Sequence, residues 1–533
     1  MTARLRFIIA AVLLASLAGG LFVDRVVRAR QPPRERAEWL LRAGRSAEAE
    51  ALYFREIELG PITVPLVVAL LDAHAAGGHS APPRKDGALE TFAPRGAESI
   101  REHAIEALLQ RSELPPDVAL LGAFWRDVHA GAVSRGERRD VERAADAEPP
   151  MPWANHLLAR EAMRERVDEA ALRYEREGVS FDRKEDVDTA LALREASGDW
   201  RAIGERLKDP RVDRLAGPWA HFRYAVEARD FRLALRWSWA ATYHARFALG
   251  PLLLALVSWA AWFAFAVRLG RVGERPLVRV PLYLSAFGLG LLSVYPTDVL
   301  IAVQESVLHL ENTGDTLHDL LYFTFGVGFR EELSKLLLFA PLSPLLLRGM
   351  RGEWISKLDV LVCGALVGLG FASVENLLYF EHGDLATAMA RFLTANFLHM
   401  AMTALTATAF IEAVRAPDRY SFDFSRTLLT VMLMHGAYDF FLSSGDSLAY
   451  FGMGVFVVLA RQFMTAVHEV RGRVGRGMPL LDVFTVGMAV VVGASFVYAA
   501  SLVGPGAAAS VLVEGMLGLL IVLYFFVQEL RRI

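Results

Sequence analysis

Long apolar segments follow one another through the second half of the chain, whereas the first half is dense in charged residues. Residues 246–533 are a series of apolar runs separated by short polar loops. A helix needs roughly 20 apolar residues to cross a hydrocarbon core of about 30 Å. A further run, 7–23, follows Arg4 and Arg6 and is typical of a signal anchor. The pattern therefore predicts a polytopic membrane protein with a soluble domain after its first span.

The predicted fold class is all-α, a bundle of nine or ten transmembrane helices with a soluble helical domain on the N-terminal side. We expect a signal anchor at 1–23, a helical domain at 24–245 and a multi-span membrane domain at 246–533. The anchor is predicted to stay uncleaved, because no small-x-small site follows it. The predicted spans are 7–23, 247–267, 280–303, 319–347, 358–380, 387–414, 427–443, 449–470, 480–503 and 510–530.

The soluble domain has apolar residues at helical spacing. Residues 37–61, with Gly44 at the turn, resemble one tetratricopeptide hairpin, and 190–210 have a similar helix–glycine–helix layout. No strict tetratricopeptide period repeats, so an irregular helical domain is an equal alternative to a solenoid. Residues 79–97 are rich in proline, glycine and charge, which predicts a loop.

Lysine and arginine alternate between successive loops of the membrane domain. Four loops carry basic residues and alternate with four that carry none. Cytoplasmic loops hold the excess of positive charge, so the first basic loop, 268–279, is placed in the cytoplasm. Both termini are then cytoplasmic and 24–245 is extracytoplasmic. Because arginine far outnumbers lysine, we expect a GC-rich bacterial genome and localisation in the bacterial inner membrane.

Composition excludes several classes of protein. The chain is 54% apolar and 22% charged, and its net charge is −3. A nucleic-acid binder needs a basic surface, which this charge balance does not supply. Cys363 is the single cysteine, so an intramolecular disulfide and a multi-cysteine metal site are both excluded.

Ionisable residues lie inside four consecutive predicted spans. Each costs about 2.5–3.5 kcal/mol on insertion scales, so each is a functional candidate by default. Their estimated depths run from mid-membrane into the outer half. Interhelical hydrogen bonding is the alternative role, which we assign to the two asparagines and the lysine. The residues are Arg330, Glu331, Glu332 and Lys335 in 319–347, Glu375 and Asn376 in 358–380, Asn396 and His399 in 387–414, and His435 and Asp439 in 427–443.

Helical spacing predicts which of these side chains meet. Glu331 and Lys335 are four residues apart and share a face, as do His435 and Asp439. The carboxylate of Asp439 can then fix the tautomer of the imidazole. Adjacent residues on a helix project about 100° apart, so Glu331 and Glu332 are not expected to face one cavity equally. We predict that one acts on substrate while the other pairs with a cation.

The chain carries no His-Glu-x-x-His, Gly-x-Ser-x-Gly or Walker A motif. Two buried acids and a histidine can activate water by general base catalysis. An opposing histidine or asparagine can stabilise the oxyanion that forms when water adds to a carbonyl. These residues predict a peptide hydrolase that forms no covalent intermediate.

The four motifs, in this order on successive spans, resemble those of the PrsW family of glutamic-type intramembrane proteases, which is related to the CAAX prenyl endopeptidases and bacteriocin-immunity-like proteins. The resemblance covers about 280–445. CAAX enzymes have Glu-Glu-x-x-x-Arg and Phe-x-x-x-His, and this chain departs from them at both points. The motifs are Glu331-Glu332-x-x-Lys335, Gly370-Phe371-Ala-x-x-Glu375-Asn376, His399 and His435-x-x-x-Asp439.

The resemblance implies a membrane endopeptidase that cuts a membrane-bound protein substrate, such as an anti-sigma factor at its first cleavage site. Carried onto this sequence, it makes Glu331 the general base with Glu332 in support. His435 and Asp439 are the facing pair. Glu375 and His399 complete the site.

Three alternatives stay open. We expect no cofactor, but a zinc ion held by His399, His435 and a carboxylate is one alternative. A proton-coupled transporter that uses the glutamates and histidines as a relay is another, although no internal repeat is evident. The third is an inactive scaffold whose domain at 24–245 binds a protein partner.

Overall fold

The computed structural model describes residues 3–26, 32–42, 45–78, 104–163, 165–243, 249–382, 390–444, 446–471 and 478–532. Every regular element within these ranges is a helix, which confirms the predicted all-α class. The chain divides into two compact units. The membrane unit comprises Met1–Ala29 and Thr242–Ile533, and the second unit is Arg30–Ala241.

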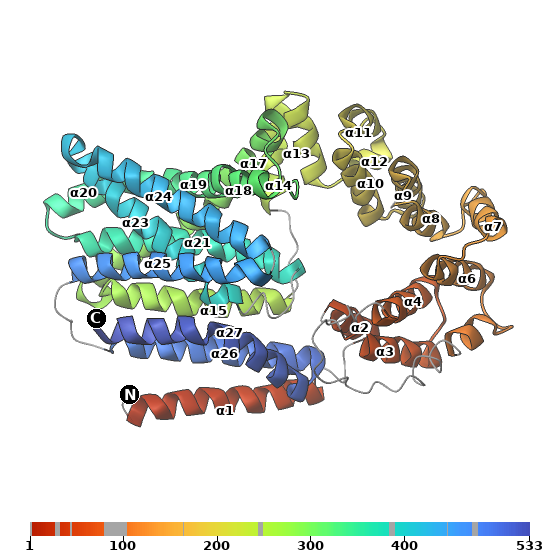
Figure 1. Cartoon of the computed structure of the whole chain (residues 1–533), viewed down its shortest axis with the longest axis horizontal. Helices are drawn as coiled ribbons and strands as arrows, with labels where there is room; N and C mark the ends of the chain where they lie inside the picture. The colour runs from red at the N-terminus through yellow and green to blue at the C-terminus, as the bar shows by residue number, and fades with distance from the viewer. Residues whose placement is uncertain are drawn as a thin grey trace. The chain divides into compact units, whose positions relative to one another are not determined.

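Long helices of the membrane unit lie side by side with nearly parallel axes (Figure 1). Short helical segments, η1–η3, join several of them. The helices are α1 (Ala3–Val26), α15 (Leu249–Leu269), η1 (Val272–Glu274), α16 (Pro276–Leu292), α17 (Val294–Leu308), α18 (Thr316–Leu321), η2 (Tyr322–Gly328), α19 (Phe329–Phe339), η3 (Ala340–Leu342), α20 (Ser343–Arg351), α21 (Lys357–His382), α23 (Ala395–Arg415), α24 (Pro417–Ser443), α25 (Asp446–Arg471), α26 (Leu480–Val503) and α27 (Pro505–Arg532).

Eight helical segments among the described residues are long and apolar enough to cross a membrane. They coincide with eight of the ten predicted spans. The other two, 427–443 and 510–530, lie within α24 and α27, which are long helices but are not among the eight. α24 begins with a largely polar stretch, Pro-Asp-Arg-Tyr-Ser-Phe-Asp-Phe-Ser-Arg, so its apolar part is shorter than that of the other spans.

α21 is the central helix of the membrane unit. In its most apolar stretch 89% of the residues are buried, against 6% for α1. Glycines let its neighbours approach closely. A Cβ at Gly370 would overlap the carbonyl oxygen of Phe287 on α16, and one at Gly290 would overlap that of Val367. Small residues at helix contacts are the usual way in which membrane helices reach close packing.

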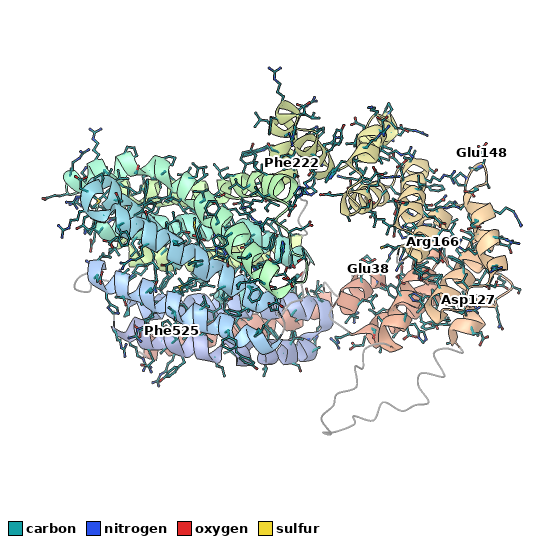
Figure 2. The ribbon with its side chains drawn as sticks, turned by 45° about the horizontal axis from the view of Figure 1, so that its top comes forward. Glu38, Asp127, Glu148, Arg166, Phe222 and Phe525 are labelled. Atoms are coloured by element: carbon teal, nitrogen blue, oxygen red, sulfur yellow. The ribbon has the colours of Figure 1, made fainter. Side chains whose placement is uncertain are left out.

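The second unit is a succession of short helices, each packed mainly against its neighbours in the chain. Figure 2 shows its side chains, with Asp127, Glu148 and Arg166 labelled. The helices are α2 (Pro33–Arg42), α3 (Ser46–Leu59), α4 (Val64–Gly78), α6 (Pro116–Ala130), α7 (Arg135–Ala145), α8 (Ala154–Ala162), α9 (Val167–Phe181), α10 (Lys184–Ala196), α11 (Trp200–Arg206), α12 (Pro210–Leu215), α13 (Pro218–Glu227) and α14 (Phe231–Tyr243).

Each of the two predicted hairpins of this unit corresponds to a pair of consecutive helices that pack together. α2 packs on α3, although the predicted turn residue Gly44 lies outside the described residues. α10 ends before Gly198, whose φ of 71° suits glycine, and α11 follows at once. The tetratricopeptide likeness stays a prediction. The predicted loop at 79–97 also lies outside the described residues.

Asp72 on α4 joins three helices of the second unit. Its carboxylate accepts hydrogen bonds from Trp125 Nε1 (2.9 Å) and from both terminal nitrogens of Arg160 (3.0 and 3.2 Å). His129 Nε2 lies 3.0 Å away. Burial acts to raise the pKa of Asp72, but the hydrogen bonds from His129 and Arg160 outweigh it and hold that pKa below its ordinary value. This carboxylate therefore stays ionised and fully bonded at neutral pH.

A buried carboxylate–imidazole cluster

The first two carboxylates of the cluster sit on α19, directly after a π-helical turn. η2 is this turn, and π-helical turns inside helices are frequent at functional sites. Glu331 and Glu332 lie in the first turn of α19, and Lys335 follows one turn later. All three side chains are buried, with 7%, 1% and 0% of their residue surface exposed.

Glycines bring α24 against η2 and so place His435 beside these carboxylates. A Cβ at Gly328 would overlap the carbonyl oxygen of Met432, and one at Gly436 would overlap that of Phe323. The two backbones are therefore in contact. His435 precedes Gly436 in the chain, and Glu331 follows Gly328 by three residues. This close approach sets the imidazole within reach of both glutamates.

A second glycine contact positions His399. A Cβ at Gly368 of α21 would overlap the backbone oxygen of His399 on α23. Glu375 lies two turns further along α21. Its Oε2 is 2.9 Å from His399 Nε2. The Gly368 contact therefore fixes the position of α23 along α21, which brings His399 next to Glu375.

Lys335 is the centre of the cluster. Its Nζ lies 2.8 Å from Glu332 Oε1, 3.3 Å from Glu331 Oε2 and 2.8 Å from His399 Nδ1. The ammonium also sits 4.0 Å from the centroid of the Phe371 ring, a cation–π contact. A buried ammonium without a neutralising carboxylate would be very costly at this depth. The two glutamates are therefore needed to keep Lys335 charged.

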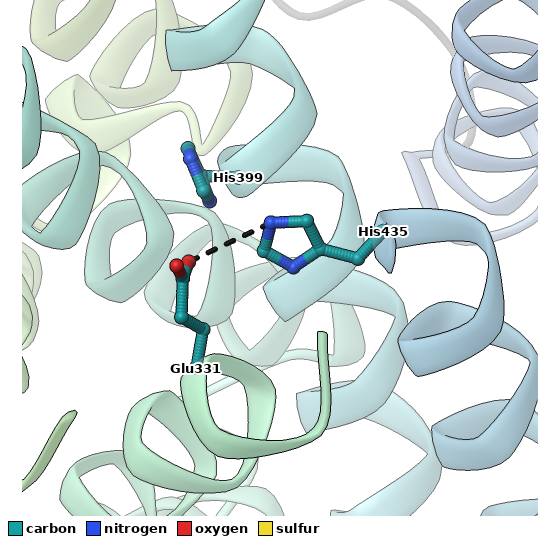
Figure 3. Close-up of side chains that lie close together, drawn as sticks. All are labelled: Glu331, His399 and His435. Carbon is teal, nitrogen blue, oxygen red and sulfur yellow. Dashed lines mark ion pairs between the residues drawn. The ribbon is translucent and has the colours of Figure 1, made fainter. Parts of the chain in front are cut away.

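His435 is held between carboxylates on both of its nitrogens. Nδ1 lies 2.9 Å from Glu332 Oε1. Nε2 lies 3.5 Å from Glu331 Oε2 and 3.3 Å from Asp439 Oδ2. The predicted contact between His435 and Asp439, one helical turn apart, is present. Figure 3 shows the carboxylate of Glu331 close to the imidazoles of His399 and His435, with the ion pair between Glu331 and His435 dashed.

The structure differs from one geometric expectation. Adjacent glutamates were expected to face different surroundings, yet Glu331 and Glu332 both contact Lys335 and His435. The backbone directions do differ by about 100°, but a glutamate side chain has three rotatable bonds and reaches around the helix. The two remain unequal in burial, since the side chain of Glu331 is 9% exposed and that of Glu332 is 1% exposed.

Arg391 also belongs to the cluster, although it is not among the site residues predicted from the sequence. Its terminal nitrogen lies 2.9 Å from Glu375 Oε1, and its Nε donates to Asn376 Oδ1 at 2.8 Å. Its guanidinium covers the ring of Tyr379 at 3.6 Å. The sequence signal was a lone arginine in an apolar segment, but nothing in its spacing pointed to Glu375, which lies on another helix.

The two asparagines bridge helices, as their predicted role as interhelical contacts requires. Asn376 Nδ2 donates to Asn396 Oδ1 at 2.9 Å, and Asn396 donates in turn to Ser258 Oγ at 2.8 Å. This chain of hydrogen bonds links α21, α23 and α15. Its members are fully buried, and each hydrogen bond replaces one that water would make.

Negative charge exceeds fixed positive charge in the cluster. It holds four carboxylates, Glu331, Glu332, Glu375 and Asp439, against two permanent cations. Glu332 Oε2 is buried and has no hydrogen-bond partner. Buried carboxylates need compensation, so further positive charge must come from the imidazoles, from protons on the acids or from a cation.

The residues present also fit a metal ion. One ligand atom each from Glu331, His399 and His435 lie within 4.8 Å of one another, which is the only such group among the described residues. A carboxylate and two imidazoles form a ligand set that zinc takes in catalytic sites. Each imidazole already has a carboxylate on its other side, Glu332 for one and Glu375 for the other. That outer arrangement is common at metal sites.

Fold and cluster together define a polytopic α-helical membrane protein with a buried carboxylate–imidazole centre. Comparison with known proteins then identifies the family that this region resembles. Residues 279–465 match the model of the PrsW family, described as PrsW family intramembrane metalloprotease. The match confirms the resemblance predicted from the four motifs. It contains every residue of the cluster and extends beyond the predicted core at 280–445.

Two curated relatives carry the name Protease PrsW. The protein of Geobacillus kaustophilus is 28% identical over 127 residues, which cover 24% of this chain and 55% of the relative. That of Bacillus subtilis is 27% identical over 186 residues, which cover 34% of this chain and 78% of the relative. The chain thus spans about half the length of the first relative, and the second unit lies outside the family match. No solved structure matches the chain.

Proposed function

We propose that the membrane unit is an intramembrane endopeptidase that hydrolyses a peptide bond of a membrane-embedded protein substrate. The observation that carries the proposal is the arrangement of Glu331 and Glu332 around both nitrogens of His435, inside a bundle long enough to cross the bilayer. The named proteases that resemble 279–465 support the same class of reaction.

Burial distinguishes the roles of the two glutamates. Glu331 is the more exposed of the pair, and its Oε2 faces His435 Nε2, so it is the carboxylate that can take a proton from an attacking water. Glu332 is almost fully enclosed and holds His435 Nδ1 at 2.9 Å. It therefore orients the imidazole. The proton accepted by Glu331 passes to the amine that leaves when the carbon–nitrogen bond breaks.

In the proposed reaction the imidazoles act on the substrate carbonyl. His435 Nε2, supported by Asp439, can donate to the oxyanion that forms when water adds to the carbonyl. His399 is held by Glu375 on Nε2, and Arg391 in turn holds Glu375. Asp439 and Glu375 are the more exposed members of the cluster, so substrate is proposed to enter from their side.

A zinc ion bound to Glu331, His399 and His435 would supply Lewis acidity and a more acidic water. Lys335 Nζ lies 2.8 Å from His399 Nδ1, so this lysine would have to move away from an imidazole that bound metal through that nitrogen. Metal analysis of the purified protein decides between the two forms of the site. One zinc per chain, lost in His399→Ala, assigns the triad to metal, whereas a metal-free active protein assigns the chemistry to the side chains.

Cleavage of a single-span peptide in lipid nanodiscs tests the proposal. His435→Ala is expected to abolish cleavage, because it removes the group that both glutamates face. His468→Ala is the matched control, since His468 is an exposed histidine on α25 of the same unit. Wild-type turnover in a folded His435→Ala protein would remove the imidazole from the mechanism.

We further propose that the protein lies in a bacterial inner membrane with the second unit outside the cytoplasm. The support is the alternation of basic and non-basic loops. A reporter that is active only outside the cytoplasm should work when fused after residue 245 and be silent when fused at 272. The reverse result would invert the topology.

We propose that the second unit meets the extramembrane part of the substrate, which in this family can be an anti-sigma factor. It is tethered at both ends, by α1 and α15, so it stays close to the bilayer. Deleting 30–240 should impair cleavage of the natural substrate while a short membrane peptide is still cut. If the folded deletion protein cuts neither, the unit is part of the catalytic machinery.

A further inference from the structure

α14 leaves a row of large apolar side chains exposed along one face. Phe231, Leu235 and Trp239 are 74%, 70% and 54% exposed. They are spaced four residues apart, so they form a stripe on one side of the helix. Other exposed large apolar residues of the second unit do not line one helix face in this way. These are Leu59, Met163, Val167 and Leu172.

Other faces of α14 are packed within its own unit. Ala234 and Ser238 are buried. The ring of Trp237 stacks on that of His221 of α13, with 4.2 Å between ring centroids. The packing of its own unit therefore leaves this stripe facing outward. A contiguous apolar surface of this kind marks an interaction site.

Charge and position in the chain identify the occupant of this face. Arg232 and Arg236 are exposed and border the stripe, and the segment 231–250 contains no aspartate or glutamate. α15, a candidate membrane span, begins only ten residues after Trp239. The last residues of α14 belong to the membrane unit, where Tyr243 Oη donates to the Leu291 carbonyl at 3.1 Å.

We propose that α14 lies on the membrane surface as an interfacial helix. Phe231, Leu235 and Trp239 insert at the boundary between headgroups and acyl chains, and Arg232 and Arg236 contact anionic lipid headgroups. Basic residues beside an apolar stripe that contains tryptophan are the composition of such helices. The helix then fixes the point at which the second unit leaves the bilayer, and this holds whatever reaction the membrane unit catalyses.

Fluorescence quenching in nanodiscs tests this placement on the full chain. Leu235→Cys is labelled with a bimane in bilayers that contain phosphatidylglycerol, and Arg143→Cys on α7 is the control, because the side chain of Arg143 is 80% exposed. Cys363 is buried, and the unsubstituted protein measures any labelling of it. Position 235 should be quenched by nitroxide lipids labelled near the headgroup and shielded from aqueous iodide. Position 143 should show the reverse.

A second pair of variants tests the role of charge. Replacing Arg232 and Arg236 by Gln in the labelled protein should lower the ratio of membrane-bound to free α14 about fivefold for each arginine in phosphatidylglycerol bilayers. The same change should have no such effect in pure phosphatidylcholine. Arg139→Gln with Arg143→Gln is the matched control on α7. Iodide quenching at 235 overturns the proposal. Shielding from iodide without quenching by lipid also overturns it, because protein then covers the stripe.

Discussion

The clusters around Lys335 in the membrane unit and around Asp72 in the second unit are both built from charged groups, but they balance charge in opposite ways. Asp72 is a single carboxylate whose oxygens take hydrogen bonds from an arginine and a tryptophan, with a histidine at 3.0 Å. Lys335 is a single ammonium with two carboxylates and an imidazole around it, and Glu332 Oε2 has no partner.

The difference separates a structural charge cluster from a reactive one. In the second unit, donors saturate the acid and water reaches the group, since the side chain of Asp72 is 29% exposed. In the membrane unit, acids outnumber permanent cations and burial is nearly complete. Excess carboxylate in an apolar bundle is costly, so its retention there indicates a functional role or a bound cation. An excess of carboxylates over permanent cations, more than the number of charged residues, therefore indicates a functional cluster.

The same substitution at two lysines is expected to give the largest contrast. Lys335→Gln leaves Glu331 and Glu332 buried without their cation, which should lower the free energy of unfolding of the membrane unit by about 3–5 kcal/mol. Lys208→Gln, in an exposed pair with Glu205, should cause no measurable change. Thermal unfolding in detergent micelles measures both. Equal melting temperatures would show that Lys335 does not stabilise the glutamates.

Substituting a glycine should destabilise the membrane unit more, the closer the neighbouring backbone lies to it. Gly368→Ala places a methyl group against the His399 carbonyl and should destabilise the membrane unit by about 1–3 kcal/mol while displacing His399. Gly288→Ala on α16 meets no atom within 4 Å and serves as the control. The melting temperature and the rate of peptide cleavage should both fall in the first variant only. Unchanged activity in Gly368→Ala would mean that the site tolerates a shift of α23.

Asp72→Asn should have a smaller effect that depends on pH. The pKa of Asp72 is lower in the folded state than in the unfolded chain, so its ionisation adds stability above about pH 4, and this is lost as pH falls through the folded value. At neutral pH the substitution should cost about 1–2 kcal/mol in the second unit. The difference from wild type should disappear at strongly acidic pH. Hydrogen exchange in α4, α6 and α8 reports it, and a difference independent of pH would contradict the assignment.

Sequence patterns predicted what depends on one helix at a time. Eight spans, the pairing of Glu331 with Lys335 and that of His435 with Asp439 all follow from hydropathy or from four-residue spacing. They are present because helical geometry is local. The predicted span 427–443 shows the limit of hydropathy, because the largely polar residues at the start of α24 shorten the apolar part of a long helix.

Residue spacing within one helix could not predict which side chains on different helices meet. His435 with Glu332, His399 with Glu375 and Arg391 with Glu375 each join different segments of the chain. Their heights are set by backbone contacts at glycines such as Gly368, which no spacing rule locates. The approach of both glutamates to Lys335 does not follow from backbone direction either, because a glutamate side chain reaches around the helix.

The central claim is that the buried cluster of the membrane unit hydrolyses peptide bonds with Glu331 as base. Initial rates of cleavage of a single-span peptide in nanodiscs test it most directly, with Glu331→Gln compared with Glu469→Gln, an exposed glutamate on α25. Glu331→Gln should reduce the rate at least about a hundredfold, as loss of a general base does, while Glu469→Gln keeps the wild-type rate. A folded Glu331→Gln protein that cleaves at the wild-type rate would contradict the claim.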